Sequence, residues 1–405
     1  MDILDKITPS KKEREKVNKV INNFLKKLKT KLKDCKLLIG GSMGKDSWIA
    51  GDHDVDVFVK FPKLYLKNDI SKILQERLKG IKFQVIHGSR DYLQFNHGDY
   101  LFELIPVIDI KTYKEAANIT DVSPLHVIWV KANNKNPEQI RLTKAFLKAN
   151  NLYGAESYIR GFSGYVVEIL TIYYGSFINL IKAAVSWKEP VILDISKFYK
   201  NKDEVINNLD KNKLSRLILI DPVQPNRNAA ASLSREKFNE FIGLCKKYLK
   251  NPHEEFFIEK KFNLQELKKK YSKDEIILFD VKELKGKQDV VGSKLLKVFN
   301  YINDKIIKEG WKIKENNWFW DKKAIFYYII EKKELSKEII HYGPPKKLKE
   351  NADKFKQKWK KYKIFEDNYK VYIKLKRKFI KLKPFVKNLI KDKYLKNLVK
   401  NIKIK

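Results

Sequence analysis

One segment constrains the fold more than any other part of this 405-residue chain: residues 40–61 read GGSMGKDSWIAGDHDVDVFVKF. Its second half is rich in β-branched and aromatic residues, which is typical of a strand. Successive side chains on a strand point to opposite faces, so Asp54 and Asp56 share one face and Val55 and Val57 share the other. The segment therefore predicts a turn of small residues followed by a strand with an acidic face.

The acidic face needs a positive partner. Two carboxylates side by side repel each other and cost free energy unless a cation lies between them. A turn of small residues beside such a strand suits a nucleotide whose triphosphate arrives with Mg²⁺. A P-loop is excluded, because Asp46 follows Lys45 and Ile39 stands where the first glycine would fall. Each element alone is commonly just a turn or a solvated strand edge; the spacing of the two favours a nucleotide site.

The Gly-Ser turn followed by Asp-x-Asp resembles the signature of the polymerase-β-like nucleotidyltransferase superfamily. The longer string is similar to that of the archaeal, class I CCA-adding enzymes, the tRNA nucleotidyltransferases. The matching positions are Gly41, Ser42, Lys45, Trp48, Gly51, Asp52, Asp54, Asp56, Phe58, Phe61 and Pro62. The resemblance implies template-independent addition of C, C and A to the 3′ end of tRNA from CTP and ATP, with two Mg²⁺ ions as cofactors and pyrophosphate as the product released.

A third carboxylate is expected for the metal that activates the attacking 3′-hydroxyl. Glu103 stands between apolar neighbours on the run 99–109, and a lone acid in so apolar a strand needs a cation or a partner. The family normally has Asp at this position, three residues before a proline, and Pro106 identifies Glu103 as the match. Asp99 is the alternative, but along a straight strand it would lie ~13 Å from Glu103.

Further nucleotide-binding positions follow from the resemblance alone. They are His126 in Ser-Pro-Leu-His, Lys144 in Arg-Leu-Thr-Lys, Tyr153 in Leu-Tyr-Gly-Ala-Glu, and Asp221 and Arg227 in Asp-Pro-x-x-x-x-Arg-Asn. The family assigns nucleotide contact to the His, triphosphate and ribose or base contact to the Lys and Tyr, and reading of the incoming base to the last pair. Lys45 replaces the usual Arg, which keeps the charge but loses bidentate phosphate geometry. His126, Tyr153 and Asp221 could equally be packing or capping residues.

The order of the patterns predicts an α+β protein of three parts. Strands are expected at 36–40, 54–61, 81–87, 91–96 and 100–110, with a helix starting at Thr8-Pro9 and another near 69–79. These form a nucleotidyltransferase palm over 1–118, followed by a helical neck over 119–251 and a mixed α/β region over 252–405. Within the neck, Arg141, Lys144 and Lys148 form a basic stripe on one helix face, ordinarily a solvated face.

The C-terminal part carries much of the chain's positive charge. Residues 346–405 hold 23 Lys or Arg against 5 Asp or Glu, and the whole chain has a formal charge of +37. Aromatic residues are interleaved with the lysines, and Lys374, Lys376 and Lys378 alternate onto one face of a strand predicted over 371–379. A basic surface with aromatics is suited to grip a phosphate backbone, so this region is expected to bind the tRNA acceptor and T arm. A solvated basic tail is the alternative.

The remaining features restrict the setting. Cys35 and Cys245 lie far apart without metal-site spacing, which fits a reducing cytosol. No signal peptide is visible, and the apolar segment 165–187 is better interpreted as a buried helix pair than as a membrane span. A homodimer is left open. The rival functions are another template-independent RNA nucleotidyltransferase, such as a poly(A) polymerase or an oligoadenylate synthetase, and a catalytically inactive RNA-binding relative.

Overall fold

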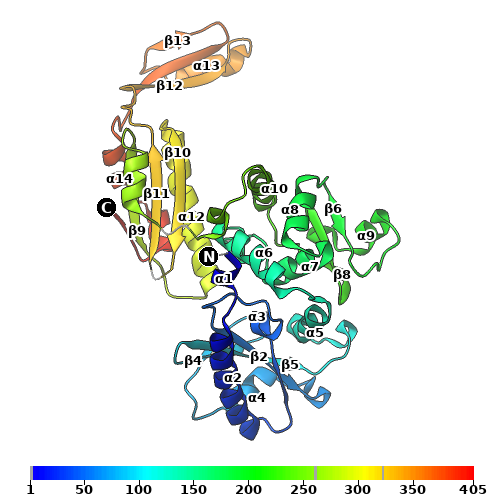
Figure 1. Ribbon diagram of the computed structural model, residues 1–405. Coiled ribbons are helices and arrows are strands. Elements are labelled where there is room, and N and C mark those ends of the chain that lie inside the picture. The colour runs from blue at the N-terminus through cyan, green and yellow to red at the C-terminus, as the bar shows by residue number, and fades with distance from the viewer. Residues whose placement is uncertain (1–2, 260–261, 322) are drawn as a thin grey trace. The chain divides into compact units, whose positions relative to one another are not determined.

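The computed structural model describes residues 3–259, 262–321 and 323–405. The chain divides into two compact units, which meet in the sequence between residues 260 and 261 (Figure 1). The first unit contains both the palm and the helical region, and the second contains the C-terminal region. The finer boundaries at 118/119 and 251/252 stay predictions.

The palm is built on a five-stranded sheet in the order β1-β2-β5-β4-β3. Its strands are β1 (Lys36–Ile39), β2 (Asp54–Phe61), β3 (Gln84–Ile86), β4 (Tyr92–His97) and β5 (Tyr100–Ile108). β2 and β5 run parallel, and the other neighbouring strands are antiparallel. The structure confirms all five predicted strands, with ends shifted by at most three residues.

Two helices, α2 (Lys11–Lys31) and α4 (Ile70–Arg77), pack on the apolar face of this sheet. Val17 and Leu28 of α2 share a core with Val55 and Val57 of β2, which leaves the acidic face of β2 on the other side. The predicted start of this helix at Thr8-Pro9 is wrong. Ser10 is the N-cap, because its Oγ accepts a hydrogen bond from the Glu13 backbone N–H at 3.1 Å, and a short helix, α1 (Ile3–Ile7), precedes it.

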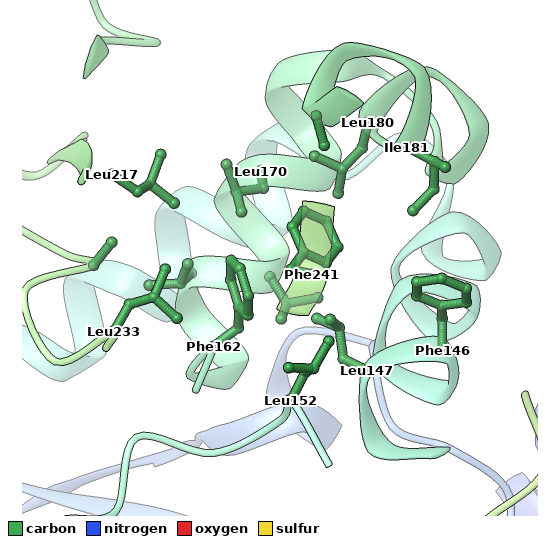
Figure 2. Close-up of a cluster of buried hydrophobic side chains, with 14 of the residues drawn as sticks. Phe146, Leu147, Leu152, Phe162, Leu170, Leu180, Ile181, Leu217, Leu233 and Phe241 are labelled. Carbon is green, nitrogen blue, oxygen red and sulfur yellow. The ribbon is translucent and has the colours of Figure 1, made fainter. Parts of the chain in front are cut away.

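The helical region surrounds a separate core that includes Phe146, Phe162, Leu170 and Phe241 (Figure 2). Its helices are α5 (Ser123–Asn133), α6 (Pro137–Ala149), α7 (Gly164–Tyr174), α8 (Phe177–Val185), α9 (Lys202–Asn208) and α10 (Arg235–Lys250). A three-stranded sheet that the sequence patterns did not predict lies among them: β6 (Val191–Leu193), β7 (Leu217–Asp221) and β8 (Gln224–Asn228). In the described ranges no single helix is long and apolar enough to cross a membrane; α7 and α8 reach that length only together, bent by 90°.

The second unit contains two sheets. The first has the order β10-β11-β9-β15 and the second has the order β12-β14-β13. The strands are β9 (Glu275–Lys282), β10 (Ile313–Trp320), β11 (Ala324–Ile330), β12 (Glu338–Pro345), β13 (Ile364–Glu366), β14 (Lys370–Lys376) and β15 (Asn401–Ile404). The helices are α11 (Leu264–Lys270), α12 (Gln288–Glu309), α13 (Lys349–Lys358), α14 (Leu382–Leu389) and α15 (Lys393–Leu398). The long helix α12 packs on β11 through Val298 and Ile302, which share a core with Phe326.

Candidate active site

Two parallel strands of the palm bring acidic residues together. The register of β2 and β5 pairs Asp56 with Glu103 and Asp54 with Leu101. Because paired residues project from the same side of a sheet, Asp54, Asp56 and Glu103 lie on one face. Gln94 of β4 adds a hydrogen bond from its Nε2 to Glu103 Oε1 at 2.9 Å. Asp99 is exposed in the turn between β4 and β5, so the register favours Glu103 as the third acid.

These carboxyl groups carry more negative charge than their surroundings neutralise. Burial raises the pKa of Asp56 to about 7, and Glu103 and Asp54 raise it further against the opposing charge of Lys45. Burial also raises the pKa of Glu103, although its hydrogen bond with Gln94 acts the other way. The described residues include no group of three His, Cys, Asp or Glu side chains arranged as a ready metal site. The oxygen-only donors nevertheless fit Mg²⁺, because a divalent cation would replace the proton that Asp56 retains.

The turn before β2 approaches these acids closely. Gly41 opens the short helix α3 (Gly41–Gly44) with a φ of +55°, a conformation that few residues other than glycine adopt. A Cβ at this position would lie 1.8 Å from Asp56 Oδ2. The glycine is therefore required both by the backbone and by the carboxylate beside it, and the turn can bring backbone N–H groups close to a ligand on Asp56.

A cavity of about 400 Å³ lies over the acidic face, large enough for the reacting part of a nucleotide. Five of the predicted site residues line it: Gly41, Lys45, Asp56, Glu103 and His126. The wall also includes Arg90 and Tyr165, which the sequence patterns did not single out. Ser42, Asp54, Lys144, Tyr153, Asp221 and Arg227 are outside this wall.

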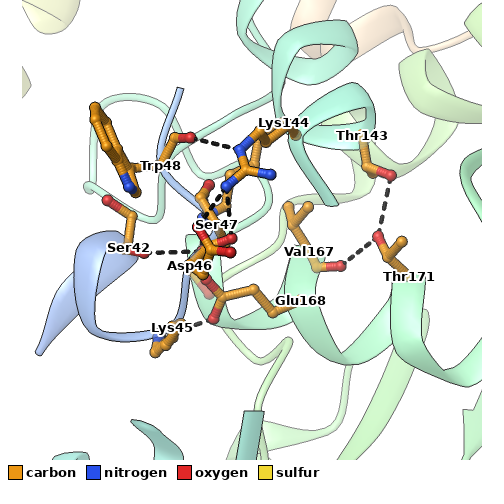
Figure 3. A network of polar contacts seen from close by, with 12 residues as sticks. Ser42, Lys45, Asp46, Ser47, Trp48, Thr143, Lys144, Val167, Glu168 and Thr171 are labelled. Carbon is orange, nitrogen blue, oxygen red and sulfur yellow. Dashed lines mark hydrogen bonds and ion pairs between the residues drawn. The ribbon is translucent and has the colours of Figure 1, made fainter. Parts of the chain in front are cut away.

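Lys144 lies in a buried network between the palm and the helical region (Figure 3). Its Nζ donates to the backbone oxygen of Ser47 at 3.1 Å, to Ser47 Oγ at 2.7 Å and to Glu168 Oε1 at 2.9 Å. The other oxygen of Glu168, Oε2, accepts from Lys45 Nζ at 2.8 Å. Burial opposes ionisation of Glu168, but the two lysines outweigh it and lower its pKa to about 2. Lys144 is only 3% exposed, so it has no donor turned to the cavity.

The basic stripe on α6 is not a solvated face. Arg141 is 1% exposed and donates to the backbone oxygen of Trp48 at 2.8 Å and to Asp46 Oδ1 at 2.6 Å. Lys148, at the end of the stripe, reaches Asp52 at 3.4 Å. The stripe is therefore the contact by which the helical region holds the loop between α3 and β2, and that is why the amphipathic pattern alone misassigned it.

A second polar cluster gathers around the buried carboxylate of Asp221 at the end of β7. Arg227 Nη1 lies 2.5 Å from Asp221 Oδ2, and Tyr165 donates its hydroxyl to Oδ1 at 3.0 Å. His126 Nε2 lies 3.1 Å from Oδ2, and its ring stacks on Tyr165. Burial lowers the pKa of His126, so the neutral tautomer with the proton on Nε2 donates to Asp221. The residues predicted to read the base thus form one cluster beside the cavity.

Tyr153 lies at the side of this region. Burial raises the pKa of its hydroxyl, and Lys148 Nζ lies 5.4 Å from the ring centroid. A Cβ on Gly164, at the start of α7, would lie 2.7 Å from the Tyr153 hydroxyl. The position is compatible with either packing or a ribose contact.

Comparisons with known proteins cover most of the chain. Residues 138–258 match the family model for the second domain of tRNA nucleotidyltransferase, and residues 276–403 match that for the C-terminal domain of CCA-adding enzyme. The CCA-adding enzyme of Nanoarchaeum equitans is 36% identical over 367 residues, which are 90% of this chain and 90% of that protein. The chain belongs to the CCA-adding enzyme family. It is a CCA tRNA nucleotidyltransferase, and the expected activity is confirmed.

Other relatives of this CCA-adding enzyme agree. The CCA-adding enzyme of Methanocaldococcus jannaschii is 30% identical over 377 residues, 89% of this chain and 83% of that protein. A solved structure of Cid1, described as an RNA terminal uridylyl transferase, superposes with a TM-score of 0.52 at 13% identity, covering 64% of this chain and 97% of that one. The Cid1 poly(U) polymerase with Mg 3′-dATP bound gives 0.50 at 12% identity, covering 64% and 96%. These structures share the fold and confirm the polymerase-β-like α+β class.

In the second unit of the CCA-adding enzyme, Lys374 and Lys376 are exposed on β14, but the strand ends at Lys376 and Lys378 follows it. Lys374 Nζ lies 5.2 Å from the Phe365 ring centroid and 3.7 Å from Glu338 Oε2. Lys378 Nζ lies 5.4 Å from the Phe379 ring centroid. The predicted strand was therefore too long, and the basic face is interleaved with aromatic rings as expected.

The sequence patterns missed Glu168 and Tyr165, which connect the predicted residues of the CCA-adding enzyme. Glu168 had a visible signal, because it is a lone acid in the apolar run of α7 and such a residue needs a cation. The argument that selected Glu103 applies equally to it. Tyr165 and Arg90 had no comparable signal, since nothing in their local sequence indicates which cavity they reach.

Proposed function

We propose that the cavity bounded by β2, β5 and α5 is where this enzyme joins CTP or ATP to the 3′ end of tRNA. The observation that carries the proposal is the register that sets Asp56 beside Glu103, next to a glycine turn that leaves no room for a side chain. Acids that face one another without bases, in a cavity of nucleotide size, are suited to a cation-dependent transfer.

Asp54, Asp56 and Glu103 would hold two Mg²⁺ ions, which when bound lower the pKa of the attacking 3′-hydroxyl and neutralise the leaving pyrophosphate. The chain's own residues position the substrates. Gly41 and Ser42 lie at the turn that approaches Asp56, and Lys45 presents an ammonium group to the triphosphate from the cavity wall. Lys144 supports that wall from behind through Glu168, and Tyr153 is kept as a ribose or base contact.

The cluster of His126, Asp221 and Arg227 is proposed to choose between C and A. Asp221 is fully buried, and its pKa is lowered to about 2 because hydrogen bonds from His126 and the charge of Arg227 outweigh burial. Asp221 thereby fixes the Arg227 guanidinium, whose planar donors can pair with base edges and phosphates. Lys374, Lys376 and Lys378 are proposed to hold phosphates of the tRNA acceptor and T arm.

A paired substitution tests the site. Glu103→Gln keeps the size of the side chain but removes the charge, and we expect loss of labelled CTP and ATP incorporation into tRNA that lacks its 3′ end. Glu103→Asp should be tolerated. Asp99→Asn is the matched control and should leave turnover unchanged, since Asp99 is exposed outside the strand. Equal activity of Glu103→Gln and wild type would remove Glu103 from the site. A homodimer stays a prediction, to be settled by the mass in solution.

A further inference from the structure

The buried carboxylate of Glu168 joins three elements that the nucleotide site depends on. We propose that Glu168 is a positioning residue for nucleotide transfer: it directs Lys45 toward the incoming triphosphate, while buried Lys144 compensates its negative charge. The inference rests on the proposed nucleotide site and adds to it a residue that touches no reacting atom. Nothing in the sequence resemblance assigned a role to this position.

The first step concerns the direction of Lys45. A lysine side chain is a flexible four-carbon stem that loses rotamer freedom when it is fixed. Glu168 Oε2 accepts one of its three N–H donors at 2.8 Å, and the Tyr165 ring lies 5.4 Å from Nζ. The described residues offer Lys45 Nζ no second hydrogen-bond acceptor, and the side chain lines the cavity. Lys45 is thus held by one contact while donors remain for phosphate oxygens.

The second step concerns charge. A salt bridge between Lys45 and Glu168 alone would be neutral, and a triphosphate would gain little from it. Lys144 restores one net positive charge, because its Nζ lies 2.9 Å from Glu168 Oε1. Its other donors go to the backbone oxygen and the Oγ of Ser47. Lys144 therefore acts through Glu168 and not on the ligand.

A purely structural clamp would not need this arrangement. Arg141 already fixes the same loop through the backbone oxygens of Trp48 and Asp46, and Ser47 Oγ donates to Glu168 Oε1 at 2.7 Å. A clamp is also weakened by every partner removed, whatever the charge of that partner. Charge compensation makes the opposite demand, because removing Lys144 and the charge of Glu168 together should harm nucleotide binding less than removing Lys144 alone.

The experiment measures KM and kcat for ATP and CTP with the full-length enzyme and tRNA lacking its 3′ nucleotides. Lys144→Met should raise KM for both nucleotides by about tenfold, the worth of one charge-assisted hydrogen bond. The double variant Lys144→Met with Glu168→Gln keeps an acceptor for Lys45 and leaves its charge uncompensated, so its KM should return toward wild type. A double variant with a KM equal to or higher than that of Lys144→Met would overturn the inference.

Two further variants protect the test. Glu168→Asp keeps the charge but draws the carboxylate back by one methylene, so KM should rise while the melting temperature changes little; unchanged KM and kcat would also overturn the inference. Thr171→Val is the matched control, because it removes a buried hydrogen bond of 3.0 Å to Thr143 between the same helices without touching Lys45. It should leave both constants unchanged.

Lys45→Ala separates the two levels of the argument. If KM for ATP and CTP does not rise in this variant, Lys45 is not at the triphosphate and the proposed nucleotide site fails with the inference. If KM rises in Lys45→Ala but the double variant shows no recovery, only the role of Glu168 and Lys144 is refuted.

Discussion

Two carboxylate sites in the first unit have opposite electrostatics. At the acid pair of Asp56 and Glu103, burial and mutual repulsion raise the pKa of Asp56 to about 7. At Glu168, burial acts in the same direction, yet Lys144 and Lys45 lower the pKa to about 2. Both sites are in strongly apolar surroundings, so burial does not decide the charge state. The groups in contact with the carboxylate decide it.

The difference indicates which acids are available to a ligand. Glu168 has both oxygens occupied by lysines and Ser47, and a cation would have to displace them. The acid pair has one amide donor, Gln94, and no base in hydrogen-bond contact among the described residues. The fold thus tolerates unfavourable charge at the acid pair, as is usual where a ligand relieves it, and satisfies the charge at Glu168.

The largest expected effect is on turnover at the acid pair. Asp56→Ala should reduce addition of both CTP and ATP by about 1,000-fold or more, because one ligand of a two-metal site is lost. Binding of tRNA should be almost unchanged, as measured by filter binding. A variant that retains more than about a tenth of wild-type turnover with Mg²⁺ would show that Asp56 is not a metal ligand.

The second prediction contrasts the stability of the two sites. Glu168→Gln leaves Lys144 without its counter-charge in a buried position, so the free energy of unfolding should fall by about 3–5 kcal/mol. Asp56→Asn removes a repulsive charge and should raise stability in metal-free buffer near pH 7. Urea denaturation measures both. Changes of the same sign in the two variants would break the comparison.

The pH dependence should differ in the same way. The folded pKa of Glu168 is depressed, so its stabilisation is present above the ordinary pKa of 4.5 and is lost as the pH falls toward about 2. The deficit of Glu168→Gln should therefore shrink in acid. The folded pKa of Asp56 is raised from 3.8 to about 7, so the gain from Asp56→Asn should grow as the pH rises through that window. Thermal melts across pH without Mg²⁺ give both slopes.

Asp221 is a third carboxylate that sharpens the comparison. It is buried but paired, like Glu168, and its partner Arg227 is expected to contact the incoming base. Arg227→Ala should raise misincorporation, or impair one nucleotide more than the other, by about tenfold. Sequencing of the added 3′ ends and separate kinetics for CTP, ATP and UTP measure this. A uniform loss for all three would assign Arg227 to phosphate binding or structure.

The smallest effect is expected in the second unit, where the exposed lysines have weak partners. Changing Lys374, Lys376 and Lys378 together to Gln should flatten the slope of log affinity for tRNA against log salt by up to ~2, since each phosphate contact contributes ~0.7 to 0.9. KM for CTP should stay normal. An unchanged slope would make these lysines a solvated face.

Much of the palm could be predicted from the sequence, because the signals there are local. The alternation of Val and Asp in β2 and the position of Pro106 determine both a strand and the residue that faces Asp56. The same reasoning missed β6, a three-residue strand whose pairing with β7 depends on residues more than twenty positions away. It also started the first long helix too early, since Thr8, Pro9 and Ser10 all satisfy start rules.

The site itself was less predictable, because its charges are settled by contacts across the chain. The stripe of Arg141 and Lys144 has the spacing of a solvated helix face, and only the loop at 46–48 and Glu168 show that it is buried. Sequence spacing on one element gives no information about an element 24 residues away that supplies the counter-charge. Long-range pairs of this kind require the fold.

The contrast between the two carboxylate sites is tested most directly by the Mg²⁺ dependence of the melting temperature near pH 7 in wild type, Asp56→Asn and Glu168→Gln, without nucleotide or tRNA. If the acid pair awaits a cation and Glu168 does not, millimolar Mg²⁺ stabilises wild type and Glu168→Gln by the same amount and leaves Asp56→Asn unchanged. An equal Mg²⁺-dependent rise in Asp56→Asn would contradict this, because the cation would then bind elsewhere.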